Sequence, residues 1–144
     1  MKKNTTSIIA TTVGIIVAAV VSKFVVNYFN DSMSFDEQLM QVSQEINKHC
    51  PFMIDQDTRL DNTIGGPGNS FTYNYTLVNY FAEEVDVDEL KERIEPQMIM
   101  NIKTSPDMEQ FRENNVTLLY KYRDKAGNFI FEIKISPGKY KESV

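Results

Sequence analysis

The chain has 144 residues, one cysteine and one histidine, with 20 acidic residues against 15 basic ones and a formal net charge of −5. A single cysteine excludes an intrachain disulfide and a cysteine-rich zinc site. From Asp31 onward the chain combines 12 Lys and Arg with all 20 Asp and Glu, a net charge of −8, which argues against nucleic acid as a partner because phosphate contacts need clustered basic side chains.

The N-terminal part is long and apolar enough to cross a membrane. No charged residue occurs between Lys3 and Lys23, and a spanning helix needs roughly 20 apolar residues. We expect residues 1–29 to be a transmembrane anchor that contacts the membrane through residues 7–29, and residues 30–144 to be an extracytoplasmic domain. A signal peptide cleaved after the small residues Val20-Val21-Ser22 is the alternative.

The charges beside this segment predict its orientation. Lys2, Lys3 and the amino terminus precede it, whereas Lys23 and then acidic residues follow it. The positive-inside rule therefore places the amino terminus in the cytoplasm and the domain on the outer side. A cleaved signal peptide would deliver the domain to the same compartment.

A helix and a hairpin are expected next. Ser34 and Glu37 form a capping-box pattern, and apolar residues then recur at helical spacing from Phe35 to Ile46. Pro51 predicts that the helix stops near His49. Residues 58–64 and 71–77 read as strands joined by the glycine-rich turn 65–68.

A second unit repeats this order. Asp86 and Glu89 form another capping-box pattern before Leu90, Ile94, Met98 and Ile102, and Pro96 should kink this helix or end its first section. Ser105-Pro106 starts a short helix that ends by Asn114. Strands at 116–122 and 129–135 flank the turn 124–128, and Pro137-Gly138 closes the last strand. We expect an α+β fold of αββ-αββ order, with one antiparallel sheet of about four strands and helices on one face.

Three stretches resemble one family. Thr58-Arg-Leu-Asp61, the glycine turn with Tyr73-Asn-Tyr-Thr-Leu-Val-Asn79, and Tyr122-Arg-Asp-Lys125 resemble a family of small bacterial envelope proteins with an N-terminal export segment. The family has no established activity. The resemblance implies a bacterial envelope location, here a single-pass inner-membrane protein with a periplasmic domain, or a periplasmic protein if the segment is cleaved.

Two groups of side chains are candidates for chemistry. His49 and Cys50 would suit nucleophilic catalysis as a thiolate–imidazole pair, but neighbouring residues at a helix end point in different directions, which favours a helix cap and a buried thiol. Asp55, Asp57 and Asp61 resemble part of a calcium loop, but the required Gly and Glu positions are Leu60 and Gly66. We expect no catalytic residue, metal or cofactor, and rank a hydrolase using Asp57 and Asp61 last.

The remaining candidates concern binding. We expect a non-enzymatic domain that binds an envelope protein, as a subunit, an assembly factor or an immunity-type inhibitor. The alternative is a small-ligand module using the open sheet face and its tyrosines, although the strand tyrosines should pack against helices. Acidic residues at a helix start also complement its macrodipole. The predicted contact residues are Thr58, Arg59, Asp61, Glu83, Glu84, Asp86, Asp88 and Glu89.

Overall fold

A computed structural model describes residues 32–141 of the chain. The N-terminal segment expected to span the membrane lies outside these residues, and no helix within them is long and apolar enough to cross a bilayer. The elements, in chain order, are α3 (Phe35–Asn47), β1 (Phe52–Met53), β2 (Thr58–Gly65), β3 (Ser70–Leu77), the 3-10 turn η1 (Ala82–Glu84), α4 (Val87–Thr104), the 3-10 turn η2 (Pro106–Met108), α5 (Glu109–Glu113), β4 (Thr117–Arg123), β5 (Phe129–Ile135) and α6 (Pro137–Lys141).

The α+β class is confirmed, but the expected sheet of four antiparallel strands is wrong in two details. Five strands lie in the order β1-β2-β3-β4-β5, and β3 pairs with β4 in parallel while the other neighbours are antiparallel. The chain leaves one end of β3 and returns through α4 and α5 to the other end, so β4 must run in the same direction as β3. The two-residue β1 is too short to produce a sequence pattern.

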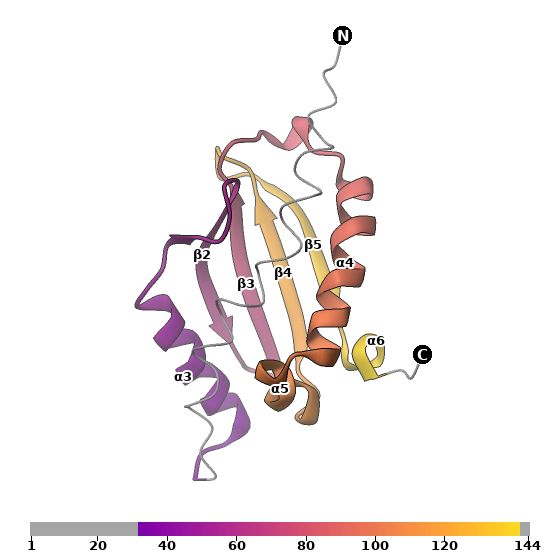
Figure 1. The fold of residues 1–144 in the computed structure, drawn as a ribbon. Coiled ribbons are helices and arrows are strands. Elements are labelled where there is room, and N and C mark those ends of the chain that lie inside the picture. The colour runs from indigo at the N-terminus through magenta and orange to yellow at the C-terminus, as the bar shows by residue number, and fades with distance from the viewer. Residues whose placement is uncertain (1–31, 142–144) are drawn as a thin grey trace.

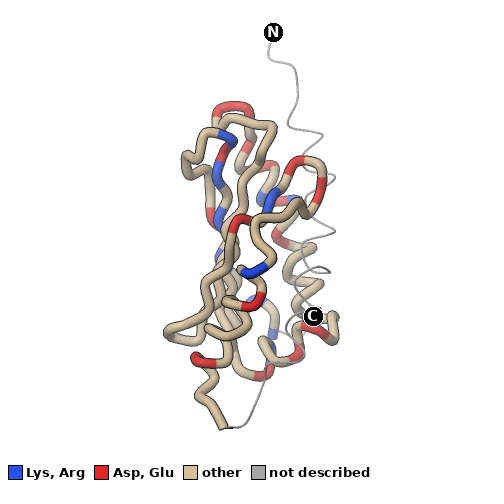
Figure 2. Tube along the Cα trace, turned by 90° about the vertical axis from the view of Figure 1, so that its left-hand side faces the viewer, with Lys and Arg blue, Asp and Glu red and all other residues tan. Residues whose placement is uncertain are grey.

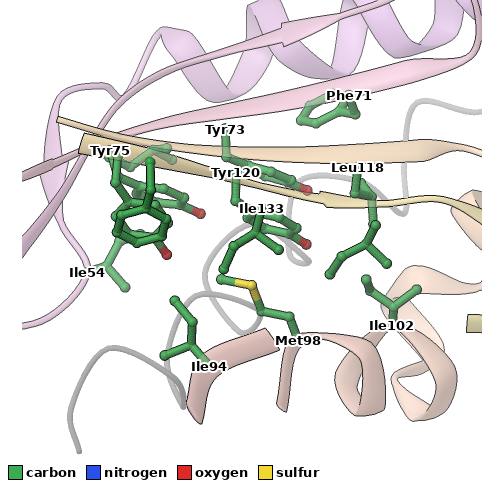
Figure 3. Close-up of a cluster of buried hydrophobic side chains, with 14 of the residues drawn as sticks. Ile54, Phe71, Tyr73, Tyr75, Ile94, Met98, Ile102, Leu118, Tyr120 and Ile133 are labelled. Atoms are coloured by element: carbon green, nitrogen blue, oxygen red, sulfur yellow. The ribbon is translucent and has the colours of Figure 1, made fainter. Parts of the chain in front are cut away.

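The helices cover one face of the sheet and leave the other open. Figure 1 shows α4 over β4 and β5, with α3 beside β2. Thr63 and Tyr73 are directly opposed, so they share a face, and Thr63 contacts α3 there through its hydroxyl group. In Figure 3 the apolar side chains of α4 point toward the strand side chains of the same face; those labelled are Ile94, Met98, Ile102, Tyr73, Leu118, Tyr120 and Ile133.

Helix α3 begins at the predicted capping box and docks tightly on β2. The Ser34 side chain accepts from the Glu37 N–H at 3.3 Å, and the Glu37 carboxylate accepts from the Ser34 N–H at 2.9 Å. Asn47 exchanges two hydrogen bonds with the Thr63 backbone, at 2.8 and 2.7 Å. A Cβ at Gly65 would lie 2.0 Å from the Leu39 carbonyl oxygen. Glycine is therefore required where β2 meets the helix backbone.

Helix α4 begins at Asp86 as expected, but Pro96 does not end it. The helix runs through 18 residues with Pro96 inside it, on the exposed side, where water can solvate a carbonyl that lacks its N–H partner. The short helical segment after Ser105 consists of η2 and α5 and ends at Glu113, before the predicted limit at Asn114. Helix α6 was not predicted; the hydroxyl group of its Tyr140 donates to the Val116 carbonyl at 2.7 Å.

Candidate interaction surface

Three loops are joined at the end of the sheet where β2 begins and β3 and β4 end. The Asp57 carboxylate accepts from the Asn79 amide at 2.7 Å, which ties the chain before β2 to the loop after β3. The same loop reaches the β4–β5 turn, because the Lys125 N–H donates to the Tyr80 carbonyl at 3.0 Å. Segments far apart in sequence, 55–61, 79–89 and 124–129, therefore form one surface, which we call the acidic end.

Asp124 organises the acidic end, although its sequence position gave no reason to single it out. Its carboxylate accepts from the N–H groups of Ala126 at 2.9 Å and Asn128 at 2.8 Å within the turn, and from that of Ala82 at 3.2 Å. Burial would raise the pKa of Asp124, but these hydrogen bonds to the charged form outweigh burial and lower it. The carboxylate is therefore a structural anion at neutral pH.

The predicted acidic residues fall into two groups. Glu84 accepts from the Phe81 N–H at 2.6 Å, and Asp86 caps α4 by accepting from the Glu89 N–H at 3.0 Å. Glu89 itself pairs with Arg93 at 2.8 Å. Within residues 32–141 the exposed side chains of Glu83 and Asp88 make no hydrogen bond or ion pair, so these two carboxylates are available to a partner.

The residues predicted at the start of β2 divide between the two faces of the sheet. Thr58 is fully buried on the helical side, so it offers nothing to a partner. Arg59 pairs with Asp61 at 2.6 Å on the open face, and Asp61 also accepts from the Thr76 hydroxyl group. Asp61 occupies a bulge in β2. Figure 2 shows acidic positions in the loops at the upper end of the molecule, with Lys and Arg positions among them.

Two exposed phenylalanines accompany these charges. The side chains of Phe81 and Phe129 are 40% and 59% exposed, and the Lys125 ammonium lies 3.9 Å from the centre of the Phe81 ring, a cation–π arrangement. Regular alternation in the predicted strand 129–135 would place Phe129 on the same face as Phe131. A bulge in the β4–β5 pairing places Phe129 opposite Arg123 instead, and nothing in the sequence signalled that bulge.

The candidate metal ligands and the candidate nucleophile lack, in the described residues, the arrangement that their chemistry requires. No group of three His, Cys, Asp or Glu residues in the described part of the chain could hold a metal ion. Asp55 accepts from the Asp57 N–H at 2.8 Å in a local turn, rather than facing a common cation with Asp61. Cys50 is only partly buried. Burial, with a smaller contribution from Asp61, raises the pKa of its thiol, which disfavours the nucleophilic thiolate.

The tyrosines lie under the helices, away from the open face. Tyr73, Tyr75, Tyr120 and Tyr122 are at most 5% exposed and stack across β3 and β4, with ring centres 5.0 Å apart for Tyr73–Tyr120 and 5.1 Å for Tyr75–Tyr122. The open face instead carries polar residues such as Asn74, which donates to Asn62. A ligand site built from tyrosines on the open face is therefore absent from the described structure.

The chain belongs to the family described as a domain of unknown function, DUF8479, whose sequence profile matches residues 34–131. A search of curated proteins finds no match. Among solved structures, the chain is similar to a Pseudomonas aeruginosa protein described as secreted, with a TM-score of 0.57 and 14% identity over 74% of this chain and 96% of that one.

Two further structures are pilotins of type 2 secretion systems. EpsS from Vibrio vulnificus has a TM-score of 0.58 and 6% identity over 75% of this chain and 93% of its own. AspS from Vibrio cholerae has a TM-score of 0.51 and 8% identity over 72% and 90% of the two chains. At such identities these similarities establish a shared fold.

Proposed function

We propose that this protein is a non-enzymatic protein-interaction domain of the bacterial envelope, held at the membrane by residues 1–29, with the domain on the periplasmic side. The observation that carries this proposal is the acidic end, where the exposed carboxylates of Glu83 and Asp88 and the exposed rings of Phe81 and Phe129 belong to the loop after β3 and to the starts of α4 and β5. Aromatic side chains supply contact energy in interfaces, and complementary charge steers a partner to them. The partner surface would be basic and partly apolar.

The structural neighbours support the same class of role. Two of the three are secretion-system pilotins and one is described as secreted, so this fold serves proteins of the bacterial envelope. Burial raises the pKa of the Cys50 thiol and so disfavours the thiolate that nucleophilic catalysis would need. The residues assigned to the contact are Glu83, Glu84, Asp86, Asp88 and Glu89, with Arg59 and Asp61 at its margin.

The test is affinity purification of the full-length chain from native membranes in mild detergent. We expect a stoichiometric partner with wild type, and its loss with Glu83→Gln/Asp88→Asn or at high salt. Neither side chain makes a hydrogen bond or ion pair within the described residues, and the loss of the Asp88 charge from the first turn of α4 should cost no more than about 1 kcal/mol, so the variant should remain folded. The matched control, Glu109→Gln/Glu113→Gln, removes the same charge from exposed positions on α5 and should retain the partner. Equal recovery of the partner with both double variants would refute the assignment of Glu83 and Asp88 to the contact. Separately, an intact mass lacking residues 1–22 would show that the N-terminal segment is a cleaved signal peptide.

One observation favours small-ligand binding as a second candidate. The hydroxyl groups of Tyr75 and Tyr122 are fully buried and have no hydrogen-bond partner within the described residues. Since nearly all buried polar groups in proteins have a hydrogen-bond partner, two unpaired hydroxyl groups are consistent with a site for a polar ligand. The ligand would bind under the helices, contrary to the sequence-based expectation of an open-face site. The stability of Tyr122→Phe separates the two candidates.

A further inference from the structure

The two edges of the sheet are finished differently. On one side, β1 pairs with the first residues of β2. Farther along β2, the Asn47 side chain of α3 hydrogen-bonds to both the N–H and the carbonyl group of Thr63. On the other side, β5 is the last strand in the order, and no strand of the described chain pairs with its outer side. An edge of seven residues, Phe-Ile-Phe-Glu-Ile-Lys-Ile, is long enough to template pairing with another strand.

The hydrogen bonds show which residues of β5 face outward. The Thr117 N–H donates to the Asn69 carbonyl at 2.9 Å, so odd-numbered residues of β4 direct their backbone groups toward β3 and even-numbered ones toward β5. Tyr120 therefore bonds to its opposed residue Ile133. Between these bonded positions, Glu132 and Lys134 direct their N–H and C=O groups away from β4. The Lys139 ammonium donates to the Lys134 carbonyl at 3.2 Å from that outer side.

We propose that a second copy of this chain adds its β5 antiparallel to this edge, around a two-fold axis at Ile133, and so continues the sheet across both molecules. This register places Glu132 opposite Lys134 of the second copy, and Lys134 opposite Glu132. Both residues face outward, so each opposed pair can exchange two backbone hydrogen bonds. Their side chains share the open face of the sheet, where Glu132 already lies 3.7 Å from Lys121.

Charge selects this register over its neighbours. Sliding the second strand by two residues in either direction keeps the backbone bonds but opposes Glu132 to Glu132, or Lys134 to Lys134. Directly opposed like charges destabilise a sheet, whereas opposite charges stabilise it. The side chains of Glu132 and Lys134 therefore make the edge complementary to itself, as an interface around a two-fold axis requires.

Helix α4 extends the same surface. Its outer side has a hollow lined by Glu92, Glu95, Pro96, Ile99 and Met100, among other residues, and Met100 is 57% exposed. Glu95 pairs with Lys139, which reaches the β5 edge. A two-fold axis perpendicular to the sheet brings this side of α4 toward the same side in the second copy, so apolar surface is buried beside the paired strands. One bond opposes association, because Lys139 must release the Lys134 carbonyl.

The test is a charge swap in the full-length chain, with mass measured by sedimentation in mild detergent. We expect wild type to dimerise reversibly. Either single reversal, Glu132→Lys or Lys134→Glu, should raise the dimer Kd by about tenfold or more. The double variant Glu132→Lys/Lys134→Glu should restore the affinity of wild type. Glu132→Pro, which removes an N–H that points away from β4 and has no partner strand within the described residues, should give a monomer. Lys121→Gln is the matched control: it breaks the same intrachain ion pair and should leave the dimer intact.

The outcomes separate this interface from any other. A chain that remains monomeric at every accessible concentration would overturn the proposal. A dimer indifferent to both single reversals, or one that the double swap fails to restore, would also overturn it, because contact through the N-terminal segment or another face requires no pairing of Glu132 with Lys134. The neutralised acidic end should dimerise like wild type, so this experiment and the partner experiment fail independently.

Discussion

Replacing Tyr122 by Phe should stabilise the protein, although it removes a polar group from the centre of the fold. The Tyr122 hydroxyl group is fully buried and has no hydrogen-bond partner among the described residues. Leaving a buried hydroxyl unpaired costs about 1–3 kcal/mol relative to the solvated group. Phenylalanine avoids that cost and keeps the ring contacts, at 5.1 Å to Tyr75 and 4.5 Å to Phe131 between ring centres.

The small void left by the missing oxygen lowers the stability and so opposes this gain. A void of that size should cost a few tenths of a kcal/mol. The balance is a gain of about 1 kcal/mol in the free energy of unfolding, or a rise of roughly 4 °C in Tm for a domain of this length. Thermal and urea unfolding of the full-length chain in detergent, followed by circular dichroism, would measure both quantities.

Tyr140→Phe is the matched control for Tyr122→Phe. Its hydroxyl group is also buried, but it donates to the Val116 carbonyl at 2.7 Å. Removing that donor should destabilise the protein by about 1 kcal/mol. The same chemical change should thus have opposite signs at the two positions. If Tyr122→Phe lowers the free energy of unfolding by about 1 kcal/mol or more, the reasoning is refuted, because a bound ligand or water must then satisfy the hydroxyl group. That result would support small-ligand binding.

Two further predictions concern the packing of α3 and the response to pH. Gly65→Ala should cost about 3 kcal/mol or more in the free energy of unfolding, because its Cβ would overlap the Leu39 carbonyl. Gly138→Ala in α6 is the control: its Cβ would meet open space, so it should be neutral or slightly stabilising. Comparable losses of stability in the two variants would contradict the close approach of β2 to α3. Burial raises the pKa of Tyr140 to about 12, and it also raises the pKa values of Tyr75 and Tyr122. Since the unfolded chain releases these protons near pH 10, the free energy of unfolding should be retained below that pH and fall above it. If the absorbance of tyrosinate rises with pH before the circular dichroism signal is lost, the buried rings are accessible and the prediction is wrong.

Local signals predicted the helix starts well. Ser34 and Glu37 satisfy each other's backbone and side-chain groups within four residues, so the sequence contains the whole arrangement. Asp86 likewise caps α4 as its position predicted. Strand alternation identified β3 and β4 and placed their tyrosines toward the helices, because period-two burial is a property of each strand alone.

Non-local geometry could not be predicted in the same way. The parallel pairing of β3 with β4 depends on where α4 returns the chain, and nothing in either strand records it. The exposure of Phe129 depends on a bulge in the pairing with β4. Asp124 is one acid among 20 in the sequence, and only the folded chain brings the Ala82 N–H to it. Sequence reasoning therefore found acidic residues of the surface but missed the residue that assembles it and the aromatic side chains beside it.

The path of the chain relates the acidic end to the proposed anchor. Asp36, at the start of α3, accepts from the N–H groups of Gly68 and Asn69 at 3.0 and 2.9 Å, so the chain enters the domain at the β2–β3 turn. The acidic end lies at the other end of β3, about 25 Å away at the usual rise of a strand. If residues 1–29 hold the entry point at the membrane, the acidic end faces away from it. Anionic lipid would repel that surface at close range. In this orientation, a domain of net charge −8 can be tethered to the membrane without placing its acidic end against the lipid. Glu83 and Asp88 would then be directed away from the membrane, toward a partner.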